Sequence, residues 1–470
     1  MTTIAETEPN TAGLLAPAYR SLTIGTIALA SMIAFEYLAV ATAMPTVARE
    51  LHGLSLYALA FGGSLAAGVV GLVVGGTWSD AAGPRRSVWQ GVTWFVIGLV
   101  VAGLSSSMWV LIGGRVLQGF GGGLLSVALY VVVGRCYPAT LHPKMFGAFA
   151  AAWVIPSIVG PSLTGLIVSQ WSWRWIFVGI ALLAVPAALL VRPALASFAT
   201  GGGSVTDSRR RTAWALGAAG GAGVLHYGGQ QRGVVALTIV GGGLLLIARF
   251  APRLLPPGTV RMRRGLPSVI ALRGIASAAF LEAEIFVPLM LIRERGLSPA
   301  GAGGTLTLAA LSWSAASWYQ GREGRVPSKV QLLRLGMSLI GVGIATTGSA
   351  LVPSVPLFLA MVGWGIAGAG MGLVYPTLSV LTLELSLPDE QGTNSSALQL
   401  GDSLFAVSAI ALGGSLFAAF VQETPIAAFV SLFGIGSALA LAGAILSSRV
   451  SPADAPSHLR PISQGEEANR

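Results

Sequence analysis

Long apolar runs, separated by short charged or Pro/Gly-rich breaks, fill the chain from residue 21 to residue 447. Most of them are roughly 17 to 25 residues long, which matches the hydrocarbon thickness of a bilayer at helical rise. Only 10% of the residues are charged, whereas a soluble domain carries about 25%. The alternation expected of a membrane β-barrel strand is absent. The pattern therefore predicts an all-α polytopic membrane protein.

The runs define fourteen candidate transmembrane helices. They cover residues 21–44, 55–78, 87–105, 108–133, 145–168, 174–194, 212–228, 233–250, 266–292, 298–319, 330–352, 355–382, 394–420 and 424–447. A count of twelve would follow if residues 212–250 formed a re-entrant or surface segment. We expect fourteen.

The positive charges are distributed unevenly between the two sides of these helices. With a cytoplasmic N-terminus, 21 of the 28 lysines and arginines fall in cytoplasmic segments, five fall in external loops and two lie inside helices. This asymmetry predicts that both termini are cytoplasmic. It also accounts for the net charge of +10 as a determinant of topology, so no nucleic-acid partner is expected.

Six apolar runs precede the central pair and six follow it. This layout predicts two bundles related by a pseudo-two-fold axis, with the substrate site between them near the bilayer midplane. The expected division is a cytoplasmic N-terminal tail, a first six-helix bundle, a linker with two extra helices, a second six-helix bundle and a disordered cytoplasmic tail. Their boundaries are 1–20, 21–195, 196–264, 265–448 and 449–470.

Three motifs stand out against this apolar background. Residues 76–86, between the second and third runs, read as a tight charged turn with Gly76, Asp80, Gly83, Arg85 and Arg86. Residues 111–122 place Arg115 and Gln118 inside the fourth run, three positions apart and therefore on one helical face. Residues 156–165 place Gly160, Pro161 and Gly165 inside the fifth run.

In this order the motifs resemble the signature loop, the helix-four motif and the antiporter motif of the major facilitator superfamily. Residues 35–45, around Glu36, resemble the first-helix motif of its fourteen-helix drug:proton antiporter family. The chain has Glu36 where that motif usually has Asp, and Ala41 where it usually has Asn. The resemblance implies the major facilitator fold, with two additional central helices, in a bacterial plasma (inner) membrane.

Proton coupling is expected at Glu36, Arg115 and Glu282. A carboxyl group deep in a membrane can take up a proton on one side and release it on the other, if each transporter state exposes it differently. The resemblance favours Arg115 as the charge that senses the protonation of Glu36. Two alternatives stay open: Glu36 forms a static ion pair or contacts substrate, and Arg115 ties its helix to backbone carbonyls.

Substrate binding is expected at Glu36, Gln118, Glu284, Gln399 and Asp402. Glu282 and Glu284 lie about 200° apart around a helix, so only one of them can face a central cavity. A solvated vestibule is the alternative for this pair. Gln399 and Asp402 are three residues apart and share one face, where they either line the cavity or are hydrated near a helix end.

Conformational switching is expected at Gly76, Asp80, Gly83, Arg85 and Arg86, and at Gly160, Pro161 and Gly165. The first group predicts a cytoplasmic latch built from charge contacts and helix-dipole interactions. In the second group the proline is expected to kink or soften its helix, and the two glycines to let a neighbouring helix pack closely. Ordinary tight packing is the alternative for the second group.

These observations predict a secondary transporter that exports lipophilic or amphipathic compounds, such as drugs or metabolites, in exchange for protons. One alternative is a dedicated exporter or flippase of an endogenous lipid, siderophore or metabolite, and another is a transport-dead sensor or scaffold. An enzyme is not expected, because no nucleophile turn, phosphate loop or metal-ligand cluster is evident. We expect a monomer among membrane lipids, with protons and small substrates as partners, and neither cofactor nor metal.

Overall fold

The computed structural model describes residues 13–53, 56–196, 206–228, 231, 233–297, 299–320, 327–420 and 424–451. Within these ranges the chain is all-helical, as predicted. The long helices are α1 (Arg20–Glu50), α2 (Tyr57–Ala82), α3 (Pro84–Gly103), α4 (Met108–Cys136), α5 (His142–Gln170), α6 (Arg174–Leu195), α7 (Thr206–Gly228), α8 (Gly233–Phe250), α9 (Leu266–Arg295), α10 (Pro299–Gln320), α11 (Lys329–Gly348), α12 (Leu357–Glu384), α13 (Gln391–Phe420) and α14 (Pro425–Leu446).

Each predicted span coincides with one of these helices, although most helices extend past the predicted ends. By length and hydropathy, 11 helices in the described ranges are suited to cross a membrane. The others, α3, α7 and α10, fall short of that criterion. The chain is therefore a multi-pass membrane protein, and the count of fourteen spans stays a prediction.

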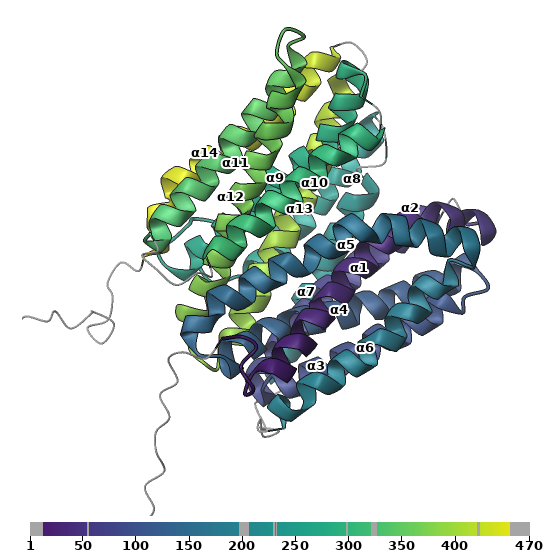
Figure 1. The fold of residues 1–470 in the computed structure, drawn as a ribbon, viewed down its shortest axis with the longest axis vertical. Coiled ribbons are helices and arrows are strands. Elements are labelled where there is room, and N and C mark those ends of the chain that lie inside the picture. Colours follow the sequence, from purple (N-terminus) through teal and green to yellow (C-terminus); the bar gives the residue numbers. More distant parts are fainter. Residues whose placement is uncertain are drawn as a thin grey trace, which may run out of the picture.

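The helices form two bundles, α1–α6 and α9–α14, which lie side by side at an angle in Figure 1. Within the first bundle α4 packs on α2 and α3, while α1 packs on α5 and α6. The second bundle repeats these pairs with each helix number raised by eight: α12 packs on α10 and α11, and α9 packs on α13 and α14. This repetition confirms the predicted architecture of two equivalent bundles.

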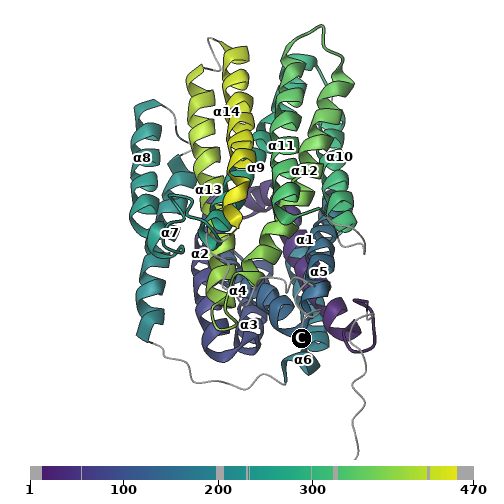
Figure 2. The same ribbon diagram turned by 90° about the vertical axis from the view of Figure 1, so that its left-hand side faces the viewer.

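The two additional helices, α7 and α8, pack on each other. Figure 2 shows them at one side of the molecule, next to α13 and α2. Contacts between these elements agree with that view, since α7 touches α2 of the first bundle and α13 of the second. The pair thus flanks the junction of the bundles. The linker residues 197–205 and most of both predicted tails (1–12 and 452–470) lie outside the described residues.

The bundles meet where α2 approaches α13 and α5 approaches α10. Gly76 lies in the first of these seams, because a methyl group added there would come within 2.7 Å of the Gly392 carbonyl oxygen and of Ser396 Cβ. At the second seam, a methyl group on Gly147 would lie 3.0 Å from the Ser317 carbonyl oxygen. Both contacts lie toward the end of the molecule that carries the α2–α3 turn, which we call the turn end.

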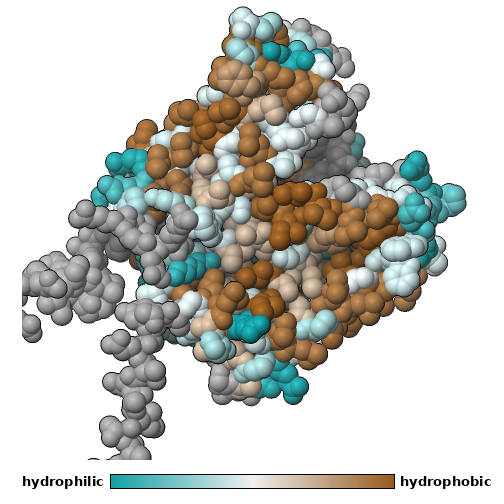
Figure 3. All heavy atoms as spheres, in the orientation of Figure 1, coloured by the Kyte–Doolittle hydropathy of each residue, from teal (hydrophilic) through white to brown (hydrophobic). Residues whose placement is uncertain are grey.

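Apolar side chains cover the flanks of both bundles, whereas hydrophilic ones gather mainly toward the ends (Figure 3). Large aliphatic side chains on different helices are strongly exposed, for example Leu182 at 64%, Leu245 at 72% and Ile445 at 76%. Such a surface suits a lipid environment, because the hydrocarbon core of a bilayer solvates apolar groups.

Candidate functional site

Three polar side chains form a buried cluster inside the first bundle. Glu36 on α1 is 5% exposed, and Arg115 and Gln118 on α4 are 4% and 2% exposed. Arg115 Nη1 donates to a carboxylate oxygen of Glu36 and, over 2.5 Å, to the side-chain oxygen of Gln118. Its Nε donates to the Ala60 carbonyl oxygen of α2 at 3.4 Å. The cluster thus satisfies an intramembrane arginine with one charge and two neutral acceptors.

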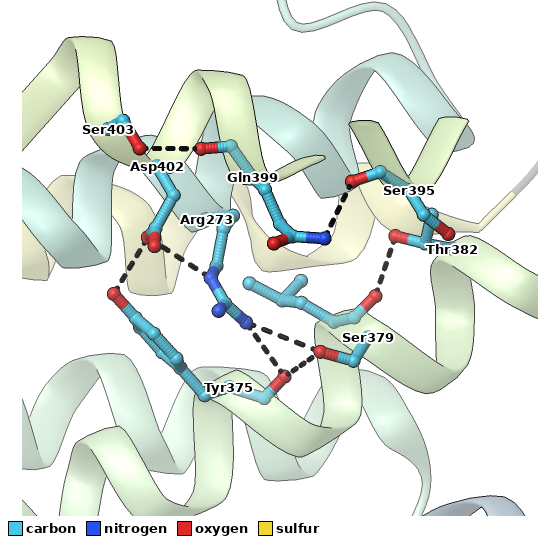
Figure 4. Close-up of polar contacts among 9 residues, drawn as sticks. Arg273, Tyr375, Ser379, Thr382, Ser395, Gln399, Asp402 and Ser403 are labelled. Carbon is cyan, nitrogen blue, oxygen red and sulfur yellow. Dashed lines mark hydrogen bonds and ion pairs between the residues drawn. The ribbon is translucent and has the colours of Figure 1, made fainter. Parts of the chain in front are cut away.

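A second buried arginine forms a matching cluster in the second bundle (Figure 4). Arg273 of α9 is 4% exposed, and its Nε donates to the carboxylate of Asp402 on α13 over 3.1 Å. The same carboxylate oxygen accepts the hydroxyl of Tyr375 on α12 at 2.7 Å. The guanidinium carbon of Arg273 lies 3.3 Å from the centre of the Tyr375 ring. Asp402 is therefore held by two partners and is not simply hydrated at a helix end.

Two further residues of Figure 4 complete this arrangement. Arg273 Nη1 donates to the Tyr375 carbonyl oxygen at 3.1 Å and to the Ser379 hydroxyl at 3.3 Å. Gln399 lies one turn before Asp402 on α13, and its amide donates to the Ser395 carbonyl oxygen over 3.5 Å. The structure thus brings Gln399 and Asp402 to one side of α13, as the spacing predicts.

The two glutamates of α9 lie in different surroundings. Glu284 is partly exposed and lies within electrostatic range of Tyr37 on α1, in the opposite bundle. Glu282 is 4% exposed and lines an apolar cavity shared by α9, α13, α14 and the end of α8. Glu284 is therefore the member of the pair that faces the first bundle. The proton-coupling role expected for Glu282 stays a prediction.

Asp80, on the last turn of α2, joins the two bundles at the turn end. Its two carboxylate oxygens accept the backbone N–H groups of Gly392 and Thr393, each over 2.6 Å. These groups belong to the first turn of α13, where unpaired N–H donors and the helix dipole favour a negative charge. Asp80 thus acts as a charged cap on a helix of the other bundle.

A second contact across the bundles lies next to this cap. Arg135, near the end of α4, donates to the Pro388 carbonyl oxygen just before α13 over 2.6 Å. Its charge also acts on the Asp80 carboxylate. We refer to Asp80, Arg135 and the backbone of residues 388–393 as the latch.

The charged turn is shorter than predicted, and its arginines take no direct part in the hydrogen bonds of the latch. Helix α2 continues to Ala82 and α3 begins at Pro84, so Gly83 alone separates them. Gly83 has φ of 73°, a conformation that glycine adopts without strain. Arg86 stacks over the Trp78 ring at 4.4 Å, within its own bundle, and both Arg85 and Arg86 are exposed. The switching role expected for the arginines stays a prediction.

Close packing at the glycines of α5 was predicted and is wrong for this conformation. A methyl group at Gly165 would meet no atom of the described residues within 4 Å. One at Gly160 would make only ordinary contact with Phe35 and Leu38 of α1, at 3.8 to 3.9 Å. Helix α5 runs through Pro161 without a break, and the proline side chain itself lies outside the described residues.

Arg273, Tyr375 and Ser379 are polar site residues that sequence reasoning left without a role. The available signal was Arg273 itself, because an arginine inside a membrane helix requires charged or polar partners within the protein. Tyr375 and Ser379 are four residues apart and therefore share one face of α12. Nothing in the sequence says which helix that face meets.

Comparison with known proteins settles the family. The profile of the Major Facilitator Superfamily matches residues 24–404, which include Glu36, Arg115, Arg273 and Asp402. The chain belongs to the major facilitator superfamily. Members of this superfamily are transporters of small molecules and not enzymes, so the polar clusters lie in a transport protein.

Two curated relatives of this superfamily member carry names that refer to drug efflux. A "Probable multidrug-efflux transporter" of Mycobacterium tuberculosis is 27% identical over 432 residues, covering 87% of this chain and 90% of the relative. The "Multidrug transporter protein MdtP" of Bacillus subtilis is 24% identical over 387 residues, covering 80% of this chain and 71% of the relative.

Solved structures show the same fold at low sequence identity. The crystal structure of the human organic anion transporter MFSD10 superposes with a TM-score of 0.68 at 14% identity, over 92% of this chain and 99% of the other. The proton:xylose symporter XylE gives a TM-score of 0.61 at 14% identity, over 92% and 96%. These likenesses confirm the predicted major facilitator fold.

Proposed function

We propose that this protein exports lipophilic or amphipathic small molecules in exchange for protons, by alternating access between its two bundles. The observation that carries the proposal is the buried Glu36–Arg115 pair between α1 and α4. A carboxylate that is 5% exposed and bound to a buried arginine has two states. Protonation would cancel its charge and release the arginine toward Gln118 and the Ala60 carbonyl.

The efflux names of the relatives support the choice of substrate class. The side chains that flank the pair also suit an amphipathic ligand. Tyr37, beside Glu36, is 54% exposed and lies 6.2 Å from Trp153 of α5, ring centre to ring centre. Glu284 of α9 approaches the same tyrosine from the other bundle. We assign substrate contact to this region, with Glu284 and Gln118 as polar contacts, and to Gln399 and Asp402 in the second bundle.

The latch supports a role in switching between states. If the positive-inside orientation holds, the turn end is cytoplasmic, and the contacts of Asp80 and Arg135 close the protein on that side. The conformation would then be outward-facing. Export requires this seam to open, so that substrate enters from the cytoplasm or the inner leaflet.

The proposal is tested by proton movement in proteoliposomes under an imposed pH gradient, with a panel of lipophilic cations and neutral lipids. We compare the wild type with Glu36→Gln, which removes the charge but keeps the shape of the side chain. The matched control is Glu384→Gln, since Glu384 pairs with Lys329 on the surface and both side chains are about 40% exposed. Exposed ion pairs of this kind contribute little to the stability of a protein.

Substrate-dependent proton flux that is lost in Glu36→Gln and retained in Glu384→Gln is the expected result. Movement of neutral lipid without any gradient, unchanged by Glu36→Gln, would overturn the proposal and favour the dedicated flippase. Proton flux that survives Glu36→Gln would remove Glu36 from the coupling site.

A further inference from the structure

An apolar cavity of about 600 Å³ lies in the flank of the second bundle. Its walls come from α9, α13, α14 and the turn end of α8 with the loop that follows. Figure 2 shows α8 standing beside α13, at the edge of that bundle. None of the described residues that line it belongs to the Glu36 or Arg273 clusters. Helix α8 and the loop that follows it thus cover a space that the second six-helix bundle alone would leave open.

One charged group points into this cavity. Glu282 is the single charged residue among the described residues that line it, and Ser408 is the other polar side chain. Glu282 is 96% buried, given its 4% exposure. Among the described residues, no hydrogen bond or ion pair to it is found, in contrast to Glu36 and Asp402. A methyl group at Gly413 would lie 2.9 Å from its carboxyl carbon, so this glycine leaves the space that the carboxyl group occupies.

An isolated carboxylate in apolar surroundings is unfavourable unless it is paired. A cation entering the cavity would supply the missing partner. The ring of Phe405 lies in the same wall, and an aromatic face attracts a cation as well. The volume falls within the range of about 300–1,000 Å³ that holds drug-sized ligands.

Access to the cavity is from the membrane side. Three residues that line the cavity are also exposed on the flank of the bundle. They are Leu412 of α13 (49% exposed) and Ile435 and Leu439 of α14 (46% and 36%). A ligand that reaches Glu282 along this route must be soluble in lipid. The ligand class is therefore restricted by the apolar wall and by the charge of the one carboxyl group.

We propose that this flank cavity is a binding site for a lipophilic monovalent cation taken from the bilayer, with Glu282 as its counter-charge. The site is distinct from the central Glu36 region and does not depend on proton exchange. It gives α8 a function in ligand binding beyond joining the two bundles.

Equilibrium binding of radiolabelled tetraphenylphosphonium to the purified full-length protein in lipid nanodiscs tests this site. All variants carry Glu36→Gln, so that binding at the central region is reduced and failure of the proposed transport function does not affect the readout. Glu282→Gln removes the counter-charge, and Ala248→Phe fills part of the cavity from α8 and keeps the carboxyl group in place. Glu384→Gln is the control, because Glu384 forms an exposed ion pair with Lys329 and does not line the cavity, and thermal unfolding without ligand checks that each variant is folded.

We expect Glu282→Gln and Ala248→Phe each to weaken binding by at least about tenfold, as the loss of a buried charge partner predicts, while Glu384→Gln leaves it unchanged. Equal binding by Glu282→Gln and its parent would overturn the assignment. Triphenylphosphine oxide is a neutral probe of similar size. If it displaces the cation equally well from Glu282→Gln and from its parent, the cavity is an apolar lipid groove, and the assignment is overturned as well.

Discussion

The cross-bundle cap made by Asp80 predicts a measurable change in the population of the closed seam. Each of its two hydrogen bonds to α13 joins a charged acceptor to a backbone N–H, and such bonds contribute about 1.5–3 kcal/mol. Asp80→Asn keeps one oxygen acceptor, which retains a neutral bond of about 1 kcal/mol. With the lower value for each of the two charged bonds, the substitution removes about 2 kcal/mol of stabilisation from the closed seam. The lower value is appropriate because Asp80 is only partly buried. A change of that size corresponds to about 30-fold in the opening equilibrium.

The opening can be measured by the labelling rate of a cysteine placed in the seam. Ser396 on α13 is 2% exposed and faces Gly76 of α2, so Ser396→Cys would react with a permeant maleimide only while the seam is open. The native Cys136 is first replaced by serine. We expect Asp80→Asn to raise the labelling rate by about 30-fold, and Glu384→Gln, which removes an exposed ion pair within the second bundle, to change it less than about twofold. An unchanged rate in Asp80→Asn would refute the reasoning that this carboxylate holds the bundles together.

Three further changes follow from the same contacts. Glu36→Ala leaves the charge of Arg115 buried and unpaired, so it should lower stability, measured by thermal unfolding, by about 3–5 kcal/mol. The double variant Glu36→Leu with Arg115→Met removes both charges and should recover most of that loss. Tyr375→Phe removes the 2.7 Å bond to Asp402 and should lower stability by about 1–3 kcal/mol, again by thermal unfolding; no change would show that the carboxylate finds another donor. Gly392→Ala would place a methyl group 2.6 Å from an Asp80 oxygen and should raise the seam-labelling rate; a lower rate would contradict the contact.

The fold was predictable because each helix must satisfy its own backbone in lipid, so its apolar run is visible in the sequence. The three-residue spacing of Arg115 and Gln118 also predicted that they share one helical face, because helical periodicity depends on local sequence alone. The partners of Arg273 were not predictable in this way. Asp402 and Tyr375 lie on two other helices, 129 and 102 residues further along the chain, and their meeting depends on how α9, α12 and α13 pack.

The latch shows a different limit of sequence reasoning. The pattern of residues 76–86 predicts a latch in which Asp80, Arg85 and Arg86 make charge contacts and helix-dipole interactions. In the structure the partner is a backbone terminus, the first turn of α13, which carries no sequence signature of its own. The structure shows the contact of Asp80 with a helix terminus, and the switching role of Asp80, Arg85 and Arg86 stays a prediction. Backbone donors become available only where a helix begins, and that position is set by the fold.

The buried ion pairs within each bundle and the Asp80 cap between the bundles have different functions. The pairs Glu36–Arg115 and Asp402–Arg273 each lie within one bundle, so a rocking motion of the bundles need not break a buried ion pair. Breaking one while both groups are charged would be costly, since it would leave two charges unpaired in a low-dielectric interior. The Asp80 cap, by contrast, spans the bundles at an end where water can replace it, and its contribution of a few kcal/mol is small enough to be overcome by ligand binding or protonation. A transporter built this way can keep each bundle rigid and place its reversible contact at the seam.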